Sequence, residues 1–442
     1  MRCEATPVGN HGPASVNSMD ENVPMEIFYV LLVLLLATRT LGELAVRLKQ
    51  PALVGELIAG VLIGVLVAQY SGTFPVLAEL PDDQVFIALT DLGIFFLMLY
   101  GGLDLQPREL GETSRQSLFV AISAMVLPLA LGTGTAWLFL PASDYKLAQA
   151  FFVGTGLAIT AVPVSIRILV DLNLLKSRMG RTVVSAAVFN DILGLILLAL
   201  LMALIRTGGL PDASAILLLL GKVALFFVIA TAVGLWLLPT LGTLIRRFVQ
   251  LEELELSFLL IVAFGFSVLA EVLAMHFIVG AFFAGLLFGR RTIDLAVYQD
   301  VKRKLSGITT GFLAPLFFAS IGLHLDLSAL GAIPLFVALL VLIAFLSKLV
   351  GAAVPARLSG FSTRDSVGLG MAMSARGAVE LVIAGIALQA GLFQKPDPPP
   401  PVVEHLFSAI VIVAMVTTLL VPMVLRWMLS RGGVAGVGEE ES

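Results

Sequence analysis

The sequence predicts an all-α membrane protein of about thirteen transmembrane helices, arranged as two inverted repeats with one broken helix in each. First, 58% of the 442 residues are hydrophobic and only 13% are charged, about half the charged share of a soluble domain. Second, the apolar residues form blocks of roughly 20 residues, the length of a membrane-crossing helix. Third, two glycine patterns recur in the same order in both halves of the chain. We therefore expect one transmembrane domain over residues 25–430, after a disordered extracytoplasmic leader (1–24) and before a short cytoplasmic tail (431–442).

Each expected span is an apolar run, and short loops join nearly all of them. In chain order the expected spans are residues 25–45, 52–69, 84–104, 116–140, 147–171, 181–205, 214–244, 255–274, 276–289, 307–325, 331–356, 365–391 and 404–428.

Basic residues divide unequally between the two sides that these spans define. Of the 27 Lys and Arg residues, 18 fall in loops on one side, 4 on the other and 5 inside spans. Because cytoplasmic loops are enriched in Lys and Arg, the N-terminus is expected outside and the C-terminus in the cytoplasm. The expected location is the cell membrane (plasma or inner), with the lipid bilayer as partner.

The internal repeat is carried by the second and third spans and by the ninth and tenth. Residues 54–64 and 279–289 share Val-Gly, Ala-Gly and a final Gly at identical spacing, and GLDL (102–105) corresponds to GLHLDL (322–327). The partners lie seven spans apart, so the two copies must face opposite ways. Inverted repeats are typical of secondary transporters, whose sites lie near the midplane, although small residues also permit close helix packing without any repeat.

The remaining composition excludes several classes of function. The net charge is -4 and no long basic run occurs, so nucleic acid is not an expected partner. Cys3 is the only cysteine, which excludes disulfide frameworks and thiolate metal sites. No cofactor and no enzymatic activity are expected.

Asp191 is the leading candidate for an ion site. It lies in the sixth span with about ten apolar-rich residues on either side. Burying a carboxylate in a membrane is costly, so such residues are functional candidates. Desolvation disfavours the charged form, and a carboxyl there could hold either a proton or a cation. The alternative is a structural Asp that is hydrogen-bonded to a neighbouring helix.

Two spans contain interruptions at corresponding positions of the repeats. The fifth contains Thr160, Pro163 and Ser165, and a proline in mid-helix removes a backbone hydrogen bond. The twelfth contains Ser-Ala-Arg-Gly at 374–377 after two glycines. Irregular backbone at membrane depth is tolerated where it is buried or lines a cavity, so the freed carbonyls and the two hydroxyls are candidate ligands. A simple proline kink and glycine packing explain either interruption alone.

Three further charges lie deep in spans: Lys348 in the eleventh, and Arg376 with Glu380 in the twelfth. Arg376 and Glu380 stand four residues apart on one helical face and can pair with each other. We expect them to balance charge around the break, and Lys348 to pair with Asp191 or to stabilise the crossed half-helices.

Four stretches resemble the monovalent cation:proton antiporter superfamily, in the branch of bacterial Na+/H+ exchangers and Kef-type systems. They are PALVGELIAGVLIG (51–64), TAVPVSIRILVDL (160–172), VVSAAVFNDILGL (183–195) and GLGMAMSARGAVELVIAGIAL (368–388). The resemblance implies a homodimer with a scaffold and a mobile core, and alternating access by an elevator-like movement. It also implies cation binding at Asp191 with Thr160 nearby, and Lys348 matches the core lysine of the superfamily.

One departure concerns stoichiometry. Many electrogenic members of the superfamily carry two adjacent aspartates, whereas the first position here is Asn190. Because Asn cannot titrate, and electroneutral members often show this Asn-Asp pair, the resemblance implies one H+ per Na+. The retained Lys348 is a feature of the members with paired aspartates.

The function expected from these features is exchange of Na+, or another monovalent cation, for H+, with cation and proton competing for Asp191. Asn190, Thr160 and Ser165 are the expected neighbouring ligands of the cation. The alternatives are K+/H+ exchange, a gated K+ efflux pathway, Na+-coupled transport of organic anions, or a purely structural membrane protein.

Overall fold

The computed structural model describes residues 23–70, 73, 75–78, 80–104, 115–160, 169, 174, 177–207, 213–237, 240, 254–273, 275–288 and 295–430. These residues are helical or irregular, and no strand occurs among them. The expected leader and tail fall almost entirely outside the described ranges, although α1 already begins at Val23.

The helices form two groups that pack mainly within themselves. The first group consists of α1 (Val23–Arg47), α2 (Ala52–Gln69), α3 (Pro75–Ala78), η1 (Leu80–Asp82), α4 (Gln84–Asp104), α12 (Leu254–Val272), α13 (Phe277–Leu287), α14 (Leu295–Ile308), η3 (Thr309–Leu313) and α15 (Ala314–Leu323). We call it the first bundle.

The other helices, apart from α10 and η2, form the second bundle. It consists of α6 (Arg115–Phe139), α7 (Lys146–Ala158), α9 (Arg178–Thr207), α16 (Ala329–Ala332), α17 (Pro334–Leu358), α18 (Thr363–Met373), α19 (Ala378–Gln389), η4 (Leu392–Gln394), α20 (Pro401–Glu404) and α21 (Leu406–Ser430). Between the bundles, α10 (Ala213–Ala232), which runs into the π-helix η2 (Val233–Leu237), contacts α9 on one side and α12 and α13 on the other.

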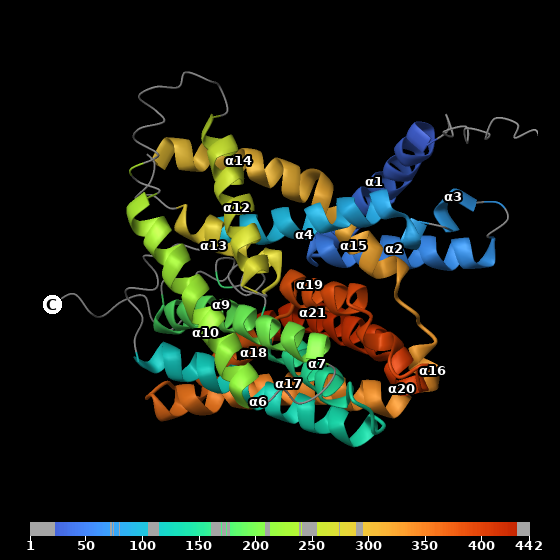
Figure 1. Cartoon of the computed structure of the whole chain (residues 1–442). Helices are drawn as coiled ribbons and strands as arrows, with labels where there is room; N and C mark the ends of the chain where they lie inside the picture. The colour runs from blue at the N-terminus through green and yellow to red at the C-terminus, as the bar shows by residue number, and fades with distance from the viewer. Residues whose placement is uncertain are drawn as a thin grey trace, which may run out of the picture.

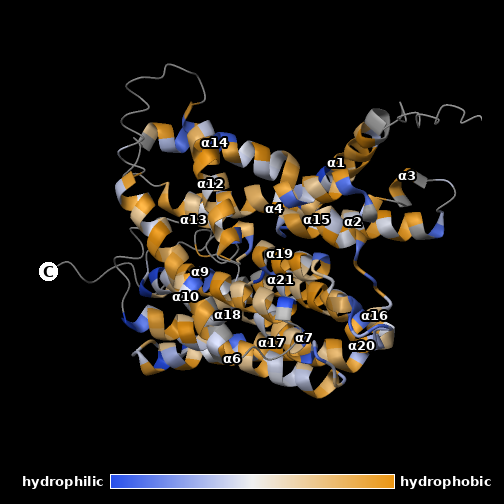
Figure 2. Ribbon diagram, in the orientation of Figure 1, coloured by the Kyte–Doolittle hydropathy of each residue, from blue (hydrophilic) through white to orange (hydrophobic). Residues whose placement is uncertain are grey.

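Figure 1 shows the bundles as two layers, with α10 running obliquely from one to the other. Figure 2 shows hydrophobic residues along most of the length of the helices, and many of the hydrophilic ones near helix ends. Ten helices are long and apolar enough to cross a membrane among the described residues, and two shorter apolar helices cover Ala52–Val67 and Phe277–Leu287. An all-helical, multi-span membrane fold is therefore confirmed.

Most expected spans coincide with helices, but one boundary is wrong. The tenth span was expected to start at 307, whereas the helix already begins at Leu295 and runs through η3 into α15. Its charged first turns are held by ion pairs of Asp300 with Arg303 and Lys304, and of Lys302 with Asp104. Pairs three and four residues apart stabilise a helix, so charged residues that resemble a loop form helix here.

Glycines bring helix backbones into direct contact at two corresponding places in the first bundle. A Cβ on Gly60 of α2 would lie 2.1 Å from the carbonyl oxygen of Ala319 in α15. A Cβ on Gly285 of α13 would lie 2.2 Å from the carbonyl oxygen of Leu99 in α4. Both positions require glycine, and both belong to the glycine pattern that recurs in the sequence.

Candidate functional site

Helix ends meet in the middle of the second bundle. The helix α7 ends at Ala158, and Ile159 is extended, with φ -78° and ψ 149°. The helices α18 and α19 are separated by the non-helical residues 374–377. The interruption expected in the twelfth span is therefore present. Ser165 and the other residues of 161–168 lie outside the described residues.

Two buried cations donate hydrogen bonds to the last three carbonyl groups of α7. The last four carbonyls of a helix have no partner within it and carry partial negative charge. The Arg376 guanidinium donates to the carbonyl oxygen of Gly156 and, at 2.8 Å, to that of Leu157. The Lys348 ammonium donates to the carbonyl oxygen of Ala158. Arg376 and Lys348 are 1% and 0% exposed, so the partial negative charge at the end of α7 contributes to balancing both buried cations.

The guanidinium of Arg376 also pairs with Glu380. The distance between its Nη1 and Oε1 of Glu380 is 2.9 Å, and both side chains are buried. The expected pairing of these two residues is confirmed. From α21, the Thr418 hydroxyl donates to the carbonyl oxygen of Arg376 at 3.1 Å, which fixes the non-helical residues between α18 and α19.

Thr160 is where the polar side chains converge. Its Oγ1 accepts a hydrogen bond from Nζ of Lys348 at 2.7 Å and another from Nδ2 of Asn190 at 3.1 Å. A hydroxyl oxygen has two acceptor lone pairs, so both are occupied in this conformation. The carbonyl oxygen of the Asn190 side chain is buried and has no hydrogen-bond partner among the described residues. Asn190 is therefore better placed than Thr160 to offer a free oxygen to a cation.

Asp191 follows Asn190 near the middle of α9, a helix of 30 residues. Its side chain is half-buried. The Lys348 ammonium makes its hydrogen bonds to the carbonyl oxygen of Ala158 and to the hydroxyl of Thr160. Lys348 therefore contacts the end of α7, as one of its two expected roles requires, and its pairing with Asp191 stays a prediction.

Freed carbonyl groups at the break in the fifth span were expected at the site, but the sequence did not show that those of Gly156, Leu157 and Ala158 would be the ones with buried cationic partners. Backbone groups carry no sequence signal of their own, but the run Gly-Thr-Gly at 154–156 marks the place. A Cβ on Gly154 would lie 2.1 Å from Oγ1 of Thr133, so glycine allows α6 to approach. The hydroxyl of Thr155 is buried without a hydrogen-bond partner among the described residues.

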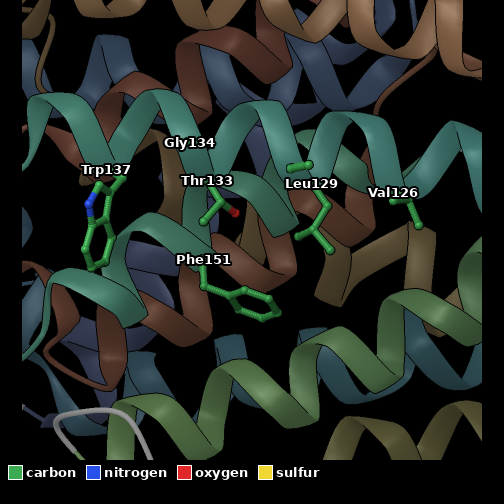
Figure 3. A pocket seen from close by; sticks show the side chains of 7 residues that line it. Val126, Leu129, Thr133, Gly134, Trp137 and Phe151 are labelled. Carbon is green, nitrogen blue, oxygen red and sulfur yellow. The ribbon is translucent and has the colours of Figure 1, made fainter.

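A separate cavity of about 460 Å3 lies between α6 and α7 (Figure 3). Val126, Leu129, Trp137 and Phe151 line it together with Thr133. Because its lining contains no ionisable side chain, it lacks the charge that a cation site needs, and we place the candidate site at the helix ends.

Buried charges at interrupted helices, inside an all-helical membrane bundle, define a secondary transporter. The transmembrane region of the sodium/hydrogen exchanger family matches residues 30–431 of the chain. The chain belongs to this sodium/hydrogen exchanger family.

Individual relatives match over nearly their whole length. The Na+/H+-K+ antiporter GerN of Bacillus cereus is 32% identical over 409 residues, which cover 91% of this chain and 96% of that protein. A Na+/H+ antiporter of Enterococcus hirae is 28% identical over 407 residues, 92% of this chain and 99% of that protein.

Among solved structures, the sodium proton antiporter MjNhaP1 of Methanocaldococcus jannaschii at pH 8 has a TM-score of 0.64 and 18% identity. The match covers 93% of this chain and 99% of that chain, and it shows that the two proteins share a fold. The family resemblance found in the four sequence stretches is confirmed.

Proposed function

We propose that the protein exchanges Na+ for H+ across the membrane by alternating access, with the two ions competing for Asp191. The observation that carries this proposal is a half-buried carboxyl near the middle of α9. The residue before it in the chain, Asn190, donates to the Thr160 hydroxyl, which also accepts from the buried Lys348. Carboxylate and carbonyl oxygens suit hard cations, whereas a protonated carboxyl is neutral and no longer attracts one. The printed activities of GerN and of the Enterococcus relative support the same exchange.

Asp191 and Asn190 would bind the cation, and Thr160 would join them once Lys348 withdraws from its hydroxyl. Ser165 remains a proposed ligand from the fifth span. With a single titrating carboxyl in this set, one proton leaves for each Na+ that binds, so the exchange is electroneutral. Lys348, Arg376 and Glu380 would balance charge at the helix ends during this cycle.

The two bundles would serve as scaffold and mobile core. Contacts between them are sparse compared with the contacts within each, which is what a rigid-body movement of one against the other needs. The corresponding backbone contacts of Gly60 and Gly285 support the two inverted repeats. The proposed protein crosses the cell membrane thirteen times, with its N-terminus outside and its C-terminus in the cytoplasm. It would work as a homodimer.

K+ is a second candidate substrate, because GerN is an Na+/H+-K+ antiporter. The same oxygens could accept K+ in place of Na+, since selectivity depends on the size and rigidity of the site.

The test is cation-driven proton movement in proteoliposomes. A preformed pH gradient is followed with a fluorescent dye while Na+, Li+ or K+ is added to vesicles with wild type or with Asp191→Asn. We expect Na+ to dissipate the gradient in the wild type and Asp191→Asn to abolish this response. Undiminished exchange in the variant would refute the assignment of Asp191 as the site. A wild-type response to K+ alone would show that K+, and not Na+, is the substrate.

A further inference from the structure

A side-chain hydrogen bond joins the two bundles directly. Nε2 of Gln389 donates to Oδ1 of Asp91 at 2.8 Å. Asp91 lies on α4 in the first bundle, and Gln389 is the last residue of α19 in the second. Because this hydrogen bond spans the two bundles, it resists separation of α19 from α4.

A small cavity lies beside this contact, between the same two bundles. It measures about 250 Å3, and it is lined by Thr90 and Ile94 from α4, by Ser320 from α15, and by Gln389 and Gln394 from the second bundle. The rest of the lining is mixed and includes His324 together with the apolar side chains of Phe317 and Ile321.

Gly385 of α19 lines this cavity too, close to Phe317 and Ile321 of α15. Gly385 stands four residues before Gln389, on the same face of α19. A Cβ on Gly385 would lie 3.2 Å from Cδ1 of Ile321 and 3.5 Å from Cε2 of Phe317. Figure 1 shows α19 at the border of its layer, next to the first bundle.

The start of α19 carries the site described above. Ala378 to Gln389 is one uninterrupted helix, and Glu380 in its first turn pairs with Arg376 at the break. A movement that carries this break relative to α4 and α15 must therefore move Gln389 away from Asp91. Local hydrogen bonds that exist in only one of two conformations bias the equilibrium between them.

From these contacts we propose that Asp91 and Gln389 form the latch of a gate between the bundles, with Gly385, Phe317 and Ile321 as its apolar seal. The latch opens in every transport cycle, and its strength sets the balance between the two access states. This inference rests on the proposed exchange function, for which it names the gating residues.

The test measures access to the cavity and does not require transport. Cys3 is the only cysteine of the sequence, so Cys3→Ser gives a cysteine-free background. Ser320→Cys then places one thiol on the cavity lining with almost no change in side-chain volume. The rate of its modification by a hydrophilic maleimide is measured in nanodiscs, where both faces of the protein are accessible.

We expect Gln389→Ala and Asp91→Ala each to accelerate this labelling about fivefold, the equivalent of one average hydrogen bond. The double variant should be no faster than either single one, because both remove the same bond. Asp91→Asn keeps an acceptor oxygen and should stay near the background rate. Gln394→Ala is the matched control, because Gln394 lines the same cavity without contributing to the bond.

Equal labelling rates in background, Gln389→Ala and Asp91→Ala would overturn the latch, and so would additive effects in the double variant or an equal effect of Gln394→Ala. Failure of the exchange function itself is seen separately. In that case neither Na+, Li+ nor K+ dissipates the pH gradient in wild-type proteoliposomes, whatever the labelling of the Ser320→Cys variants shows.

Discussion

Arg376→Met is expected to destabilise the protein strongly. The substitution leaves Glu380 buried without its partner, which had been 2.9 Å away, and it removes the donors to the carbonyl oxygens of Gly156 and Leu157. Breaking a buried ion pair by removing one partner costs about 3–5 kcal/mol. At about 2 °C per kcal/mol for a large domain, the melting temperature should fall by about 6–10 °C.

The assay is thermal unfolding in detergent, followed by the loss of the monodisperse peak in size-exclusion chromatography. Arg47→Met is the matched control, since Arg47 pairs with Glu43 at 3.0 Å, also four residues apart on a helix, but with both side chains exposed. An exposed pair contributes about 0–1 kcal/mol. The double variant Arg376→Met/Glu380→Met should recover part of the loss, because no buried charge is then left unpaired.

Equal melting temperatures for Arg376→Met and Arg47→Met would refute the assignment of the buried pair as charge balance at the break. A double variant less stable than Arg376→Met would refute it as well.

Three further predictions follow from the same contacts. Lys348→Met frees the Thr160 hydroxyl and removes a nearby positive charge, so the apparent Na+ affinity should rise severalfold in a direct binding assay. Lys222→Met, a substitution in α10 between the bundles, should leave the affinity unchanged, and equal affinities in the two variants would contradict a role of Lys348 at the site. Gly60→Ala and Gly285→Ala should each lower the melting temperature, because overpacking costs about 1–3 kcal/mol. Gly265→Ala should not lower it, because a Cβ at that position meets open space. Equal melting temperatures of the three variants would contradict the close backbone contacts. If protons and Na+ compete for one carboxyl, the Na+ concentration for half-maximal exchange should rise about tenfold per pH unit on the acid side, and a flat profile from acid to alkaline pH would exclude competition.

The sequence alone predicted the fold largely because membrane spans are long and apolar. The expected ranges 52–69 and 84–104 coincide with α2 and α4, since bilayer thickness imposes the length of the run. The start of α14 was missed because Asp300, Lys302, Arg303 and Lys304 have the composition of a loop, and only their ion pairs reveal a helix.

The side chains of the candidate site were also predictable in kind, because a charge within an apolar run is conspicuous. Arg376 and Glu380 were expected to pair from their spacing, and they do. The partners of Lys348 were not predictable, because the carbonyl oxygen of Ala158 is a backbone group 190 positions away. The latch between Asp91 and Gln389 spans 298 positions, and no local pattern connects two such distant residues.

The most direct test of cation and proton competition at Asp191 is the number of protons released when Na+ binds. Purified protein in weakly buffered solution is mixed with Na+ at acidic pH, where the carboxyl is protonated, and the released protons are counted with a pH indicator. The wild type should release about one proton for each Na+ bound, and Asp191→Asn should release none. Na+ binding by the wild type at acidic pH without proton release, or undiminished release by Asp191→Asn, would contradict the proposed mechanism.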